Sequence, residues 1–285
     1  MSYRNTQYTL AEGYLSAVEY GYSDSAKCSL VFIHGWLDNA ASFESVMKEL
    51  HGLEPALHLC AIDLPGHGQS SHKSGNNFYS FHDYIDDIYQ FLSELSPKKL
   101  VLVGHSLGAL VASCYSAAFP EQVSALVEIE GRGPLSEDSE NTVSRLREGV
   151  LNRQKIRSRP NRAFLSQDDA VDVRAKINQI PSALISPIVQ RGLKKVSDGW
   201  LWRHDEKLQG QSLYRMSHQH AQSVRKGIVC PHLVVLGQNG FPYLRQVQEG
   251  ELRTVEVATV EGGHHCHLES SSRVSSLIFA LVNRI

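Results

Sequence analysis

The sequence predicts an α/β protein built on a parallel, doubly wound sheet. Short apolar segments rich in β-branched residues alternate with longer segments of helical periodicity in four successive units, and this alternation is typical of parallel sheets. The most informative segment is KKLVLVGHSLG at 98–108, where an apolar strand runs through a glycine-rich turn into a helix. With 285 residues, the chain can form one large domain with an insertion or two ordinary domains.

The first half of the chain supplies the elements of this sheet in order. Residues 5–20 alternate loosely between polar and apolar side chains around a glycine, which predicts two antiparallel edge strands. Residues 28–33 (CSLVFI) predict a buried strand, followed by HGW and a helix. Residues 57–64 (LHLCAIDL) predict a third unit, whose amphipathic helix covers 80–95. Residues 100–103 are the predicted strand that leads into the GHSLG turn.

The sheet continues after this segment and resumes near the C-terminus. A strand is predicted at 123–129 (VSALVEI), and two more at 230–236 and 252–260. The helical pattern at 270–282 ends the chain. These segments extend the parallel sheet on both sides of a long interruption.

The interruption covers residues 132–226 and predicts an inserted helical subdomain. Its helical patterns lie around 142–156 and 168–180, and Pro160, Pro181 and Pro187 interrupt them. We therefore expect a core formed by residues 1–131 and 227–285. The inserted segment has 18 Lys or Arg against 10 Asp or Glu, whereas the remainder has 10 against 20. This asymmetry is explained equally by a solvated Arg-rich surface and by attraction of an anionic substrate.

The composition indicates an ordinary globular protein. Apolar residues make up 42% and charged residues 20%, the formal net charge is −2, and the mean hydropathy is −0.24. This balance gives no support to nucleic-acid binding. The N-terminal residues lack the pattern of a signal peptide, and no apolar run is long enough to span a membrane. Five widely spaced cysteines suggest free thiols, so we expect a cytoplasmic protein.

Ser106, in the GHSLG sequence, is the candidate nucleophile. A serine at a strained strand-to-helix turn presents its hydroxyl above the edge of the sheet, although a serine here can also merely cap the helix. Such a serine needs a base, and His264 follows the last strand directly after two glycines. His265 and His267 are expected to pack against the core. Because no acidic or cysteine set accompanies these histidines at metal-ligand spacing beyond Cys266, we expect no metal, and we expect no cofactor.

These motifs carry a family resemblance. HGW at 34–36, DLPGHGQS at 63–70, GHSLGA at 104–109 and GHHCHLE at 263–269 resemble, in this order, the α/β-hydrolase fold superfamily. Residues 190–208 are similar to the lid segment of the serine hydrolase-like proteins and related bacterial esterases. The resemblance implies an eight-stranded, mostly parallel sheet with a helical cap at 132–226 after strand six. It also implies Ser106 as nucleophile, His264 as base and an oxyanion hole formed by the backbone N–H groups of Trp36 and Leu107.

The sequence departs from the superfamily at the expected acid of the triad. The matching turn after strand seven is GQNG at 237–240, which contains no carboxylate. We predict that Glu130, at the end of strand six beside the nucleophile strand, replaces it. Glu128 is the rival, since alternation along the strand puts it on the same face two residues deeper. Both carboxylates could also simply pair with the basic cap.

The predicted activity is hydrolysis of carboxylic esters of short to medium acyl chains, through an acyl-enzyme. Thioesters, amides and carbon–carbon bonds remain alternative substrates, and a silent ligand-binding protein is the non-enzymatic alternative. His105, Trp200 and Trp202 are candidate substrate contacts, although the two tryptophans could equally anchor the cap. We expect a small-molecule ester as the partner and a monomer or a homodimer as the assembly.

Overall fold

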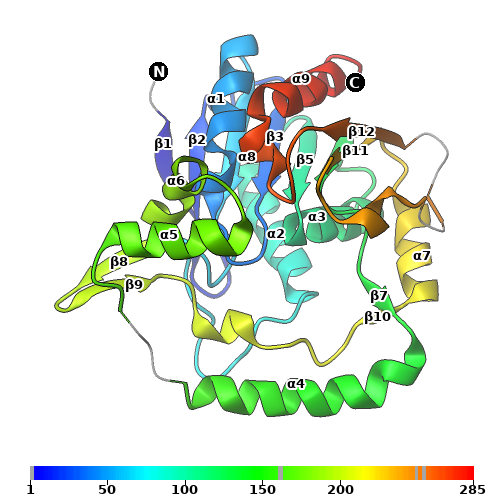
Figure 1. Cartoon of the computed structure of the whole chain (residues 1–285). Helices are drawn as coiled ribbons and strands as arrows, with labels where there is room; N and C mark the ends of the chain where they lie inside the picture. Colours follow the sequence, from blue (N-terminus) through cyan, green and yellow to red (C-terminus); the bar gives the residue numbers. More distant parts are fainter. Residues whose placement is uncertain (1–2, 160–162, 248–249, 252–254) are drawn as a thin grey trace.

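The computed structural model describes residues 3–159, 163–247, 250–251 and 255–285. Eight strands form one sheet: β1 (Arg4–Thr9), β2 (Tyr14–Tyr20), β3 (Ser29–Ile33), β4 (His58–Ile62), β5 (Leu100–His105), β6 (Ala125–Ile129), β11 (His232–Gly237) and β12 (Glu256–Val260). Their order is β1-β2-β4-β3-β5-β6-β11-β12 (Figure 1). β2 pairs antiparallel with β1 and β4, and all other neighbours are parallel. The predicted α/β class and mostly parallel sheet are confirmed. Residues 252–254 of the predicted last strand lie outside the described residues.

Helices cover both faces of this sheet. They are α1 (Glu44–Leu53), α2 (Asp83–Leu95), α3 (Leu107–Ala118), α7 (His218–Gly227), α8 (Cys266–Glu269) and α9 (Ser271–Val282), with short 3₁₀ turns η1 (Ala40–Phe43) and η4 (Pro242–Arg245). Strand β3 shows the two layers, because its side chains alternate between them. Leu30 and Phe32 pack with α1 and α9, whereas Val31 and Ile33 pack with α2 and α3. No helix in the described ranges has the length and apolar character required to cross a bilayer.

Residues 132–226 contribute no strand to the large sheet. They contain β7 (Ser136–Glu137), η2 (Ser139–Asn141), α4 (Thr142–Arg157), α5 (Gln167–Asn178), α6 (Ser182–Gly192), β8 (Leu193–Val196), β9 (Gly199–Trp202), η3 (Glu206–Gln209), β10 (Met216–Ser217) and most of α7. The predicted helices are present, but β7 pairs with β10 and β8 with β9. These strands of two to four residues are too short for an alternating pattern to be read. Pro160 lies outside the described residues.

Contrary to the prediction, Pro187 does not interrupt a helical segment. It lies inside α6, where it removes one backbone hydrogen bond without ending the helix. Ile185, Ile188 and Val189 of the same helix are buried in an apolar cluster. Tertiary packing of this face therefore outweighs the local preference of proline.

Apolar contacts and ion pairs join the inserted segment to the sheet domain. Leu268 of α8 belongs to the same apolar cluster as the buried faces of α5 and α6. Arg174 on α5 pairs with Asp38 at 2.7 Å, and Arg191 on α6 pairs with Asp63 at 2.8 Å. Both aspartates are buried. The segment is thus fixed to the loops that follow β3 and β4, while its role as a cap stays a prediction.

The turn between β5 and α3 depends on two glycines. A Cβ on Gly108 would overlap the carbonyl oxygen of Ile33, and one on Gly104 would overlap the backbone at Ala109. Helix α3 can therefore approach β3 closely because these positions carry no side chain. Between them, Ser106 adopts a φ of +49°, which is unusual for a residue with a Cβ.

We predict that Gly108→Ala lowers the free energy of unfolding by about 1–3 kcal/mol, because the added methyl must push α3 away from β3. The matched control is Gly52→Ala in α1, where the added Cβ meets nothing within 4 Å. This control should raise stability by about 0.5–1 kcal/mol, since glycine is the poorer helix former. Urea unfolding of the three proteins measures both effects. Equal stability of the two variants would contradict the close approach.

Candidate active site

Ser106 lies between the end of β5 and the first residue of α3. Its N–H donates to the carbonyl oxygen of Ile129 at 2.9 Å, which ties the turn to the end of β6. The hydroxyl makes no capping hydrogen bond to α3, so the alternative in which this serine only caps the helix does not describe the turn. Because of the strained backbone, the hydroxyl is instead available for a hydrogen bond to another side chain.

That group is the imidazole of His264. Its Nε2 lies 3.0 Å from Oγ of Ser106, and its Nδ1 lies 3.3 Å from Oε2 of Glu130. The histidine follows β12 through a turn at Gly262, whose φ of +111° is the left-handed conformation that glycine favours. Its side chain is 26% exposed, whereas that of Glu130 is 1% exposed. The structure therefore brings the hydroxyl, the imidazole and the carboxylate into one line from the ends of three parallel strands.

The carboxylate of Glu130 is held by the loop that follows β11. Its Oε1 accepts a hydrogen bond from the N–H of Gly237 at 2.8 Å, and its Oε2 accepts one from Phe241 at 3.2 Å. A Cβ on Gly240 would overlap the carboxylate. The GQNG turn thus lacks an acid of its own. Together with Phe241 it provides space and two donors for the acid that follows the neighbouring strand β6.

Glu128 lies in a different environment. Its Oε2 is 2.7 Å from Nε2 of His232, and its Oε1 accepts from the N–H of Gly133 at 2.8 Å. The two glutamates do not share a face as expected, because β6 ends at Ile129 and Glu130 turns into the left-handed conformation with a φ of +47°. The geometry therefore favours Glu130 over Glu128 as the partner of the imidazole.

The expected oxyanion donors lie on either side of Ser106. Leu107 is the first residue of α3, so its N–H is one of those that a helix leaves without an intrahelical acceptor. Trp36 follows the HG pair after β3, and its indole Nε1 donates to the carbonyl oxygen of Leu208 in η3 at 2.9 Å. This bond fixes the loop that carries the Trp36 N–H against the inserted segment.

His105 lies beneath His264 and away from solvent. The ring is 1% exposed, and its Nε2 donates to the carbonyl oxygen of His264 at 2.8 Å. Burial, with the neighbouring histidines, lowers the pKa of His105 well below its ordinary value. This placement speaks against the expected substrate contact, because a buried ring bonded to the backbone of the base supports that backbone.

Two cavities open beside Ser106. One of about 200 Å³ is lined by Ser106 and Glu130, together with Phe241 from the loop after β11. The other, of about 270 Å³, is lined by Leu107 and Trp36 together with further, mainly apolar side chains of the core and the inserted segment. Leu110 and Leu135 line both cavities. The sequence did not indicate the side chains beyond the motifs, because they come from distant segments.

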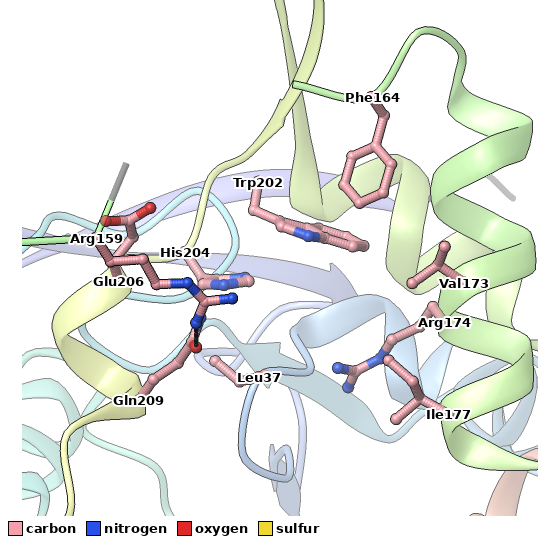
Figure 2. Close-up of a pocket in the computed structure, with 10 residues that line it drawn as sticks. All are labelled: Leu37, Arg159, Phe164, Val173, Arg174, Ile177, Trp202, His204, Glu206 and Gln209. Carbon is pink, nitrogen blue, oxygen red and sulfur yellow. Dashed lines mark hydrogen bonds between the residues drawn. The ribbon is translucent and has the colours of Figure 1, made fainter. Parts of the chain in front are cut away.

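Trp202 lines a third and larger cavity, of about 570 Å³, within the inserted segment (Figure 2). Phe164 and Arg174 face the same space. Neither Trp200 nor Trp202 is among the described residues that line the two cavities beside Ser106. Both rings pack against the apolar cluster of the inserted segment. Their anchoring role thus has direct support, and their contact with substrate stays a prediction.

The fold and this geometry can be compared with known proteins. The family described as α/β hydrolase fold matches residues 29–165. The serine hydrolase-like protein of Danio rerio is 25% identical in a match that covers 86% of this chain and 78% of that protein. A pimeloyl-[acyl-carrier protein] methyl ester esterase of Vibrio vulnificus (strain YJ016) is 37% identical in a shorter match, which covers 35% of each chain. A solved structure of a hypothetical protein from Pseudomonas aeruginosa PAO1 is 28% identical, covers 99% of each chain and has a TM-score of 0.89.

The family match includes the strand, the turn and the helix around Ser106. Together with the named relatives it supports a hydrolase activity. The eight-stranded sheet and the flanking helices agree with the same grouping. The chain has the α/β-hydrolase fold, and its sequence is similar to the serine hydrolase-like proteins.

Proposed function

We propose that the chain hydrolyses carboxylic esters through an acyl-enzyme on Ser106. The observation that carries this proposal is the line of contacts from Ser106 Oγ to His264 Nε2 at 3.0 Å and from His264 Nδ1 to Glu130 Oε2 at 3.3 Å. A serine hydroxyl is a weak nucleophile at neutral pH, and an oriented imidazole within hydrogen-bond reach overcomes this weakness.

Each member of this line has one role. Ser106 Oγ attacks the ester carbonyl carbon while His264 Nε2 takes the hydroxyl proton, and the same imidazole returns the proton to the departing alcohol. Water then attacks the acyl-enzyme, and His264 again takes and returns the proton. Glu130 accepts from Nδ1–H, which orients the ring and stabilises the imidazolium. Two backbone donors, the Gly237 N–H to Oε1 and the Phe241 N–H to Oε2, hold this carboxylate in place.

The negative charge that develops on the carbonyl oxygen is stabilised by the N–H groups of Trp36 and Leu107. Backbone donors fixed in advance lose little energy in reorganisation, and each such donor typically contributes about 3–4 kcal/mol to transition-state stabilisation. The Trp36 indole bond to the inserted segment supports this arrangement, since it restricts the loop that carries one donor.

The cavity of about 270 Å³ beside Leu107 is the proposed acyl site. Its lining is mainly apolar, with Leu110, Leu135 and Met216 among the side chains, and it suits a short to medium alkyl chain. The smaller cavity at Ser106 then takes the alcohol. An ester is favoured over the alternative bonds because the Vibrio vulnificus relative is named for the methyl ester on which it acts. We further propose that residues 132–226 form a cap over these cavities.

Replacement of Ser106 by Ala should abolish the hydrolysis of p-nitrophenyl butyrate and the covalent labelling by a fluorophosphonate probe. The oxyanion donors alone should retain no more than about 10³- to 10⁴-fold acceleration over water. Ser113→Ala is the matched control, because Ser113 also lies in α3 and its hydroxyl donates to the carbonyl oxygen of Leu110 within the same helix. A wild-type protein that neither reacts with the probe nor hydrolyses esters would instead be a ligand-binding protein.

Glu130→Gln should lower kcat by about 10³- to 10⁴-fold with a smaller change in KM, because the imidazole loses its orientation and the imidazolium its counter-charge. Glu128→Gln is the control and should leave kcat within a few-fold. That variant should lower the free energy of unfolding by about 1–3 kcal/mol through its buried contact with His232. Steady-state kinetics and urea unfolding separate the effects, and the reverse pattern would transfer the acid role to Glu128.

Met216→Trp should shift the acyl preference toward acetate by filling the proposed acyl site. Four methylenes left outside the cavity correspond to about 3 kcal/mol of lost burial, so kcat/KM for an octanoate relative to an acetate should fall by about 100-fold. Trp202→Ala is compared in the same ester series. If the preference follows Trp202 and is unchanged by Met216→Trp, the acyl chain occupies the larger cavity of Figure 2.

A further inference from the structure

A second cluster of ionisable side chains lies directly behind His264. It consists of Asp38 from the loop after β3, His105 at the end of β5 and His265 from the loop after β12, and all three are buried. Asp38 Oδ2 lies 3.2 Å from His265 Nε2 and 3.7 Å from His105 Nδ1. The three atoms all lie within 4.8 Å of one another.

His105 Nδ1 is a buried polar atom with no hydrogen-bond partner. The carbonyl oxygen of His264 can only accept, so the His105 proton is on Nε2 and a lone pair remains on Nδ1. A nitrogen lone pair therefore faces a carboxylate oxygen, and both are electron-pair donors that a cation between them would satisfy.

The backbone of Gly35 packs directly against the two donors. A Cβ there would lie 2.8 Å from His105 Nδ1 and 3.3 Å from Asp38 Oδ2. The φ of Gly35 is not in the positive region, so this glycine is explained by its close approach to the cluster and not by a backbone turn. Any side chain at this position would overlap the two donors.

We propose that Asp38, His105 and His265 bind a divalent transition-metal ion such as Zn²⁺. Two imidazoles and one carboxylate are a common ligand set for such ions, with bonds of about 2.0–2.2 Å. Ligand atoms around a tetrahedral ion at that distance lie about 3.4 Å apart, and the separations of 3.2 and 3.7 Å lie on either side of this value.

The next layer of side chains fits the same site. His105 already donates its other N–H to a backbone carbonyl, which is the usual arrangement of a ligating histidine. Asn178 has an unpartnered Oδ1, and its Nδ2 lies 3.3 Å from His265 Nδ1. Rotation of this amide would let Oδ1 accept from Nδ1–H when the His265 proton moves from Nε2 to Nδ1 and frees Nε2 for the metal.

Arg174 is the group that opposes the ion. Its guanidinium holds Asp38 Oδ1 at 2.7 Å, which leaves Oδ2 for the histidines but adds a positive charge beside the site. The ion pair with Arg174 is that of an ionised carboxylate, which a metal ligand must be.

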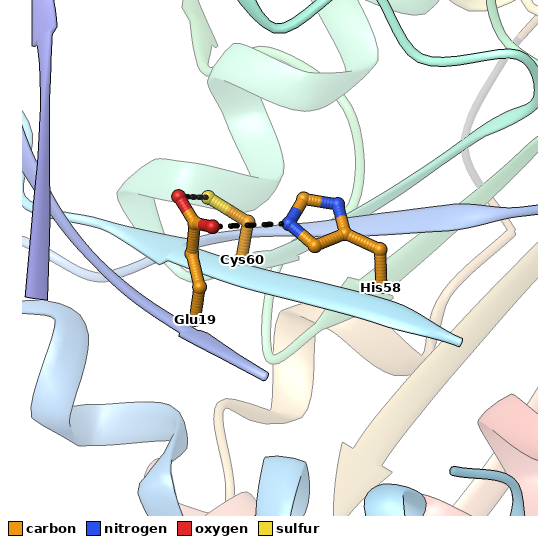
Figure 3. Close-up of side chains that lie close together, drawn as sticks. All are labelled: Glu19, His58 and Cys60. Atoms are coloured by element: carbon orange, nitrogen blue, oxygen red, sulfur yellow. Dashed lines mark hydrogen bonds and ion pairs between the residues drawn. The ribbon is translucent and has the colours of Figure 1, made fainter. Parts of the chain in front are cut away.

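A comparable cluster on the neighbouring strands β2 and β4 provides the contrast (Figure 3). There, Glu19 contacts His58 and Cys60, and its two oxygens also accept from side chains of β1, namely Arg4, Thr6 and Tyr8. Burial raises the pKa of the Cys60 thiol well above its ordinary value, so it is not a thiolate. This carboxylate is saturated by protein donors, and the cluster is explained as a link between β1, β2 and β4.

The test uses the full chain, stripped of metal with EDTA and titrated with Zn²⁺ by calorimetry and with Co²⁺ by visible absorption. We expect one ion per chain and a cobalt spectrum typical of nitrogen and oxygen ligands without thiolate bands. Asp38→Asn and His265→Gln should each weaken binding by about 100-fold or more, since loss of even an outer partner costs about 10- to 100-fold. Arg174→Gln should tighten binding by about tenfold, because it removes a like charge.

Two controls keep the outcome independent of the proposed hydrolase chemistry. His264→Ala and His58→Gln should leave zinc affinity unchanged, and circular dichroism verifies that each variant is folded. Zinc binding that is lost in His264→Ala would assign the ion to the Ser106 site, and loss in His58→Gln would assign it to the Glu19 cluster. Absence of binding tighter than about 100 µM in the wild type and in Arg174→Gln would also overturn the proposal, even if the ligand variants fail to fold.

Discussion

The close approach of α3 to β3 is the constraint on which the site depends. Gly108 lies against the carbonyl oxygen of Ile33, and this contact sets the position of the first turn of α3 above the sheet. Ser106 is thereby held with a positive φ at the helix N-terminus. Its N–H bonds to Ile129 of β6, and its hydroxyl contacts His264 in the loop after β12. Since the carboxyl ends of parallel strands meet at one edge, the other groups need only short loops to reach it.

Charge pairing between the inserted segment and the sheet domain gives a physical reason for part of the charge asymmetry in the sequence. The basic surplus of residues 132–226 includes Arg174 and Arg191, which pair with the buried aspartates Asp38 and Asp63. An unpaired buried carboxylate would be costly, so these two aspartates require the inserted segment to be present. The sequence suggested either a solvated surface or an anionic substrate, and for these two arginines the structure shows pairing with carboxylates of the sheet domain.

The local part of the design could be predicted from the sequence, and the long-range part could not. The alternation of apolar and amphipathic segments led to the parallel sheet and to the strand–turn–helix around Ser106, because these features depend on neighbouring residues. The contact of Glu130 with His264 depends on the positive φ of Glu130. It also depends on the absence of a side chain at Gly240, which lies in the loop after β11. In the same way, nothing near His265 in the sequence indicated that Asp38 lies beside it.

Burial also explains why, of four neighbouring histidines, His264 is the one suited to proton transfer. His105, His265 and His267 are almost completely buried, whereas His264 is partly exposed to the cavity at Ser106. Burial holds the pKa of His105 far below its ordinary value and lowers that of His267 to about 3, so both stay neutral at physiological pH. The layer beneath the base therefore fixes its backbone through His105 Nε2.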